Sequence, residues 1–92
     1  MLHLINLEYH DVLSANALVQ NCMQLLAAND VVIFMNSGSQ LKNVETLIEL
    51  DSCRYFYLKC SLATDNTTKI SPIDIKDFAN FCAQHSNIYS WY

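Results

Sequence analysis

The chain has 92 residues, of which 52% are hydrophobic, and its formal net charge is -4. A chain of this length holds one hydrophobic core, so residues 1–92 are expected to form a single domain without a linker. The five basic residues are scattered along an acidic chain. This argues against direct nucleic-acid binding, which needs a concentrated positive surface.

The apolar segments are too short for a membrane span, which needs roughly 18 to 20 continuous apolar residues, and no basic segment precedes the first of them. We therefore expect a cytoplasmic protein without a membrane partner. Thiols stay reduced in that compartment, so the cysteines are expected to be free. They are Cys22, Cys53, Cys60 and Cys82.

The first third of the chain predicts a strand, a helix and a second strand. The apolar run Leu2 to Ile5 predicts a short buried strand. Ser14 is the expected N-cap of the helix that follows. The β-branched run VVIFM, bounded by turn residues, predicts a central strand covered on both faces. The apolar stripe of the helix is expected to comprise Leu18, Cys22, Leu25 and Leu26.

The middle of the chain predicts a second helix and two further strands. Leu41, Val44 and Ile48 have helical spacing, and this helix is expected to end near Asp51. The segment RYFYLK predicts a third strand, and ISPI predicts a weak fourth strand. Proline cannot donate a hydrogen bond to a sheet, so Pro72 limits that strand.

The end of the chain predicts a last helix that begins after Asp74 as its N-cap. The tail SNIYSWY is expected to pack back on the domain or to point outward. The inward face of the helix is expected to carry Ile75, Phe78, Ala79 and Cys82.

The alternation of strands and helices predicts an α/β fold. Such an order requires crossover connections, which give a mostly parallel sheet with helices on both faces. We expect a three-layer α/β/α domain with about four or five strands. The order of the strands is left open.

Ligands in open parallel sheets gather at the carboxyl ends of the strands, so the turn after the second strand is the first candidate site. Helix amides at Ser37, Gly38 and Ser39 could hold an anion, but a tight turn from strand to helix is the favoured explanation of this segment. The three glycines of a dinucleotide site and the Gly-Lys-Ser/Thr of a phosphate loop are missing. The histidines and cysteines lack metal-ligand spacing, so we expect neither metal nor cofactor.

Two cysteines are candidate carriers of sulfur. Cys60 follows the third predicted strand, where a parallel sheet places reactive groups, and Lys59 is beside it in the sequence. Cys22 lies on the apolar stripe of the first helix, and free cysteine is among the most buried residue types. Each therefore has a structural alternative as a small hydrophobic residue.

Aromatic residues crowd the C-terminal part of the chain, and a small domain buries only a modest share of its surface. Part of this apolar surface is expected to meet another subunit. The candidate interface residues are Phe78, Phe81, Tyr89 and Trp91.

The chain resembles the TusB/DsrH family of sulfur-relay subunits over nearly its full length. The resemblance rests on the opening MLHLIN, the strand VVIFMNSG with its glycine turn, the segment IDIKDFANFCAQH, and the tryptophan one residue from the end. None of these is a catalytic motif. The family assignment depends on the pattern and the length together.

The resemblance implies a non-catalytic subunit that assembles with TusC-like and TusD-like partners into a heterohexamer with two copies of each. In that assembly a TusD-like cysteine carries the persulfide toward downstream sulfur-relay proteins and 2-thiouridine at the tRNA wobble position. The DsrH branch, associated with sulfur oxidation, has a cysteine in the first helix, at about the position of Cys22. A persulfide-carrying subunit of a DsrEFH-like complex is therefore the alternative, and a stand-alone homo-oligomer with another binding function is a third.

Overall fold

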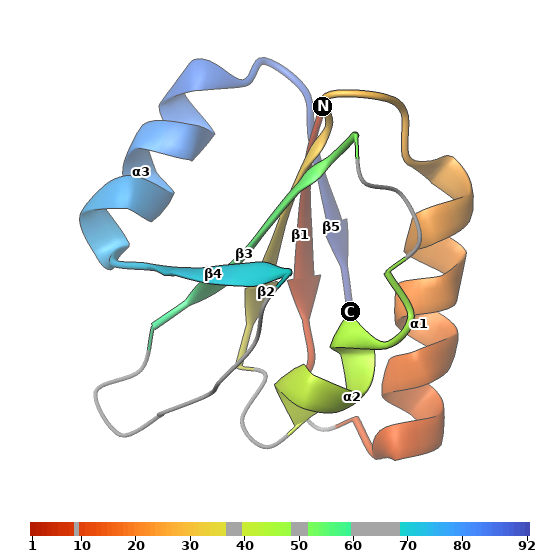
Figure 1. The fold of residues 1–92 in the computed structure, drawn as a ribbon. Helices are drawn as coiled ribbons and strands as arrows, with labels where there is room; N and C mark the ends of the chain where they lie inside the picture. Colours follow the sequence, from red (N-terminus) through yellow and green to blue (C-terminus); the bar gives the residue numbers. More distant parts are fainter. Residues whose placement is uncertain (9, 37–39, 49–51, 60–68) are drawn as a thin grey trace.

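The computed structural model describes residues 1–8, 10–36, 40–48, 52–59 and 69–92, which form one five-stranded sheet with three helices (Figure 1). None of these helices is long and apolar enough to cross a membrane. In chain order the elements are β1 (Leu2–Asn6), α1 (Val12–Leu25), β2 (Val31–Met35), α2 (Leu41–Glu45), β3 (Arg54–Leu58), β4 (Ile70–Ile73), α3 (Ile75–Gln84) and β5 (Ile88–Trp91).

The strand order is β4-β3-β2-β1-β5, and every neighbouring pair is parallel. The predicted α/β/α fold with a parallel sheet is therefore confirmed. The C-terminal tail forms the fifth strand, because β5 pairs with β1 and places Ile88 beside Leu2 and Trp91 beside Ile5. The two edges of the sheet are thus β4 and β5.

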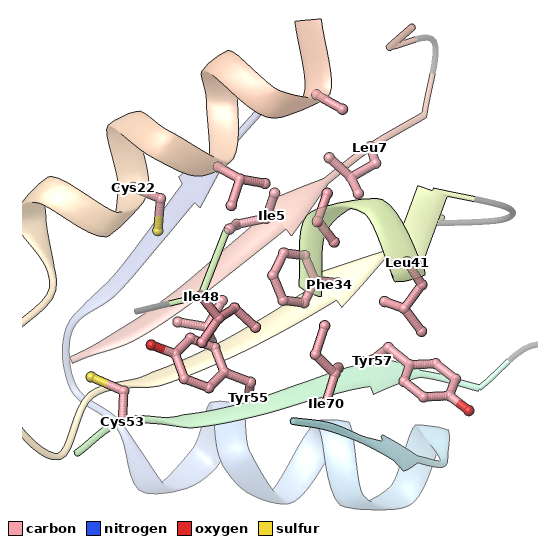
Figure 2. Close-up of a cluster of buried hydrophobic side chains, with 14 residues drawn as sticks. Ile5, Leu7, Cys22, Phe34, Leu41, Ile48, Cys53, Tyr55, Tyr57 and Ile70 are labelled. Carbon is pink, nitrogen blue, oxygen red and sulfur yellow. The ribbon is translucent and has the colours of Figure 1, made fainter. Parts of the chain in front are cut away.

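The sheet is covered on one face by α1 and α2 and on the other by α3 (Figure 1). Alternate residues of each strand point to opposite faces, so in β1 Ile5 belongs to the α1 side and Leu2 to the α3 side. The α1 side holds the larger buried cluster, with Phe34 at its centre (Figure 2). The four buried residues of the smaller cluster are Leu2, Val31, Ile33 and Ile73.

The start of α1 differs from the sequence prediction. Asp11, and not Ser14, is the N-cap, and its carboxylate accepts a hydrogen bond from the Ser14 amide at 2.7 Å. The buried face is also turned by about one position, because Ala15, Val19 and Cys22 are fully buried while Leu25 is 59% exposed. Leu18 and Leu26, also predicted for this face, are only partly buried at its margin.

The start of α3 is as predicted, with the Asp74 carboxylate accepting from the Asp77 amide at 2.8 Å. Its inward face is different, since Ile75 and Ala79 are exposed. The side chains that reach the sheet are Phe78, Phe81 and Cys82. Spacings of three and four residues place these three on one side of the helix.

The remaining boundaries follow from local chemistry. Asn36, with a φ of 54°, ends β2 in the left-handed region that asparagine tolerates. The second helix ends at Glu45, earlier than predicted, although Ile48 is still buried. Pro72 lies in the edge strand β4. The Lys59 amide donates a hydrogen bond to the carbonyl of Ile73, the residue after Pro72. By alternation the proline nitrogen faces away from β3, so the ladder loses no hydrogen bond.

Candidate functional site

The Cys22 thiol lies in the interior of the protein. Its side chain points from α1 toward the sheet and has no exposed surface (Figure 2). Burial raises the pKa of this thiol from 9.0 to about 12, and the nearby Asp30 carboxylate and Cys53 add to the effect. Because the thiolate is the nucleophilic form of cysteine, this position disfavours chemistry at sulfur.

Two of the remaining cysteines lie among the described residues, and both are free thiols. Cys53 is buried, and its Sγ donates to the Ala27 carbonyl at 3.1 Å, whereas Cys82 on α3 is partly exposed. Cys60 and the predicted anion-binding turn, residues 37–39, lie outside the described residues. The predictions for these residues stay predictions.

Side-chain amides gather at the carboxyl ends of β1 and β2, and it is at the carboxyl ends of its strands that a parallel sheet places ligands. The Asn6 side-chain oxygen Oδ1 accepts from the Asn36 side-chain amide at 3.1 Å and from the Glu8 backbone amide at 3.0 Å. The Gln40 side chain donates to the His10 carbonyl, and its own buried oxygen has no hydrogen-bond partner among the described residues. These groups tie together the segments that follow the two strands.

A small cavity of about 140 Å³ lies at the other end of the strands, where β3 and β4 begin. It is lined by Ile48, Cys53, Tyr55 and Lys69. The Lys69 ammonium donates to the Ile48 carbonyl at 3.3 Å, and the Cys53 thiol donates to the Ala27 carbonyl. These polar groups are engaged within the protein. A cavity this small is below the several hundred Å³ typical of ligand pockets.

A buried polar network was missed by the sequence analysis. His3 in β1 has 1% exposure, and its Nε2 lies 3.2 Å from an oxygen of the buried carboxylate of Asp30. The Trp91 indole Nε1 lies 3.3 Å from the other nitrogen of the His3 ring, Nδ1. The two rings are stacked, with their centroids 6.5 Å apart. Three segments, β1, the residue before β2, and β5, therefore meet at one histidine.

The carboxylate of Asp30 is well satisfied, although burial alone acts to raise its pKa. It accepts from the Ala27 amide at 3.0 Å, from the Met1 amino group at 3.0 Å, and from His3. These hydrogen bonds and the Met1 charge outweigh burial and lower its pKa below the ordinary value of 3.8. Asp30 is therefore ionised at neutral pH.

The predicted interface residues fall into two groups. Phe78 and Phe81 are partly buried and face the sheet from α3. The centroids of the Phe81 and Phe56 rings are 5.0 Å apart. On β5, Tyr89 is 47% exposed, while Trp91 packs against the α1-side cluster. Beside Tyr89 the same strand exposes Ile88, and Tyr92 beyond it is 77% exposed.

The described part of the chain contains no group of three or more histidine, cysteine or acidic side chains that could hold a metal ion. Comparison with protein-family models, with curated proteins and with solved structures finds no match.

Proposed function

We propose that this chain is a non-catalytic subunit of a cytoplasmic sulfurtransferase complex that acts in 2-thiouridine formation at the tRNA wobble position. Its partners are TusC-like and TusD-like subunits in a heterohexamer. The resemblance of the opening segment, the glycine turn and the C-terminal segment to the TusB/DsrH family is the starting point. The chain itself contributes assembly surface, and a partner supplies the reactive thiol.

The burial of Cys22 is the observation that carries the non-catalytic assignment. A sulfur carrier must expose a thiolate to a donor and then to an acceptor. Cys22 has no exposed surface, and its pKa is raised to about 12. This favours packing over the alternative in which Cys22 carries a persulfide.

The edge strand β5 is the surface that supports assembly. Leu2 donates to the Asn87 carbonyl, so by alternation the backbone groups of Ile88 and Ser90 face away from the sheet. Single-domain proteins usually protect such an edge with charge or proline. The opposite edge, β4, contains Pro72, whereas β5 has the sequence IYSW with neither protection.

The assembly is tested by tagging the chain in its native host and identifying the proteins that co-purify. The proposal expects two subunits of similar size in equal amounts. Recovery of the chain alone, under conditions in which it is folded, would contradict the assignment to a hetero-oligomer.

The reaction is tested by deleting the gene and measuring 2-thiouridine in bulk tRNA. Deletion should abolish the modification, and the Cys22→Ser and Cys82→Ser variants should both restore it. Loss of thiolation in Cys22→Ser with the complex still assembled, together with a sulfur adduct of about 32 Da on Cys22, would establish the carrier alternative. Unchanged 2-thiouridine in the deletion strain would reject a function in tRNA thiolation.

A further inference from the structure

The two partners of His3 fix the protonation of its ring. An indole Nε1–H can only donate, so the Trp91 contact requires Nδ1 of His3 to be the acceptor and to carry no proton. The Asp30 carboxylate can only accept, so Nε2 carries the proton and donates. The network therefore holds His3 as the neutral Nε2–H tautomer.

The same two partners respond in opposite ways to a second proton. An added proton on Nδ1 would face the Trp91 N–H, and the hydrogen bond to the indole would be lost. The Asp30 carboxylate, 3.2 Å from Nε2, would gain a full ion pair with the imidazolium. Histidine is the side chain that ordinarily titrates between pH 5 and 8.

We propose that His3 is a proton-operated latch for the edge strand β5. Neutral His3 accepts the Trp91 hydrogen bond and holds the end of β5 against β1. A proton taken from solvent onto Nδ1 strengthens the pair with Asp30 and releases the indole, so that β5 loosens from the sheet as the pH falls.

The surroundings of His3 allow this exchange. Among the residues that the structure describes, the charged groups that face the network are the Asp30 carboxylate and the Met1 amino group, which is 3.0 Å from the other Asp30 oxygen. From α1 the Cys22 thiol approaches Asp30 and stays protonated, and from β5 the Tyr89 ring lies 6.2 Å from His3. Trp91 is on an edge strand with one neighbour, so its release breaks into no other strand pair.

The latch can be tested on the unmodified protein, because Trp91 is the single tryptophan and gives one indole N–H signal in nuclear magnetic resonance spectra. Nitrogen chemical shifts of the His3 ring should identify the Nε2–H tautomer at about pH 8. As the pH is lowered, solvent exchange of the Trp91 indole proton should rise at least tenfold, with the same midpoint as the protonation of the His3 ring seen in those nitrogen shifts.

Three outcomes would overturn the latch. They are an Nδ1–H tautomer at high pH, a Trp91 signal that stays unchanged while His3 titrates, and a His3 ring that stays neutral until the whole domain unfolds. Asp30→Asn removes the charge that receives the imidazolium, and it should move the Trp91 transition to lower pH. The matched control is His10→Gln, since the His10 ring bonds the Ser14 hydroxyl on the exposed side of the protein and has no part in the His3 network, so the Trp91 midpoint should stay unchanged.

Discussion

The two main helices cover opposite faces of one sheet, yet they bury very different amounts of side chain. Ala15, Val19 and Cys22 of α1 are fully buried, whereas none of the ten residues of α3 is. Each helix carries one cysteine, and only the α1 cysteine is sealed from solvent. The chemistry open to a residue type therefore depends on which face of the sheet it packs against.

The reactivity of the two cysteines gives the largest expected difference. A pKa raised from 9.0 to about 12 lowers the thiolate fraction of Cys22 about a thousandfold at neutral pH. Cys82 is partly exposed. Peptide mapping after alkylation of the folded protein should find Cys82 modified long before Cys22. Both should react at similar rates in denaturant, and equal rates in the folded protein would remove the contrast between the helices.

Core truncation on the two faces should show the same contrast in stability. Phe34→Ala empties the centre of the fully buried α1-side cluster and should lower the free energy of unfolding by about 3 to 5 kcal/mol. Phe78→Ala on the α3 side should cost about 1 to 2 kcal/mol, because part of that ring already meets water. Urea denaturation measures both. Equal losses would mean that α3 seals its face as tightly as α1.

The buried carboxylate predicts a pH dependence of stability. The pKa of Asp30 is lowered in the folded protein, so its ionised form stabilises the fold above the ordinary value of 3.8. This stabilisation should be lost progressively as the pH falls below about 4. Asp30→Asn should cost about 2 to 3 kcal/mol at neutral pH and flatten the acid limb of the stability curve. Asp77→Asn, on the exposed start of α3, should change stability by less than about 0.5 kcal/mol and keep the acid limb.

Much of the fold follows from the sequence, because apolar periodicity reports burial directly. The strand VVIFM is buried on both faces as predicted, and Asp74 caps α3 as predicted. The rotation of α1 was missed because Asp11 and Ser14 are both good caps, and they stand three residues apart. The last strand was missed because it is short, carries Ser90 in its middle, and is held by its pairing with β1.

The polar network was beyond sequence reasoning for a different reason. His3 lies 27 residues from Asp30 and 88 residues from Trp91 in the chain. These residues meet only because β1 lies between β2 and β5 in the sheet, and periodicity carries no information about strand order. The sequence gives one sign of such a contact. His3 is a polar residue inside the apolar strand β1, and Asp30 stands directly before the apolar strand β2.

A substitution on β5 should have little effect on stability and tests which edge of the sheet binds partners. Tyr89→Ser on β5 removes a side chain that is 47% exposed, so the free energy of unfolding should change by less than about 1 kcal/mol. If β5 is the assembly edge, this variant should lose its partners in co-purification, because aromatic anchors carry a large part of interface energy. Ile75→Ser is the matched control, since it removes a 69% exposed apolar side chain just after β4 at the opposite edge. Loss of partners in Ile75→Ser with retention in Tyr89→Ser would instead place the interface on α3, where the sheet is covered least.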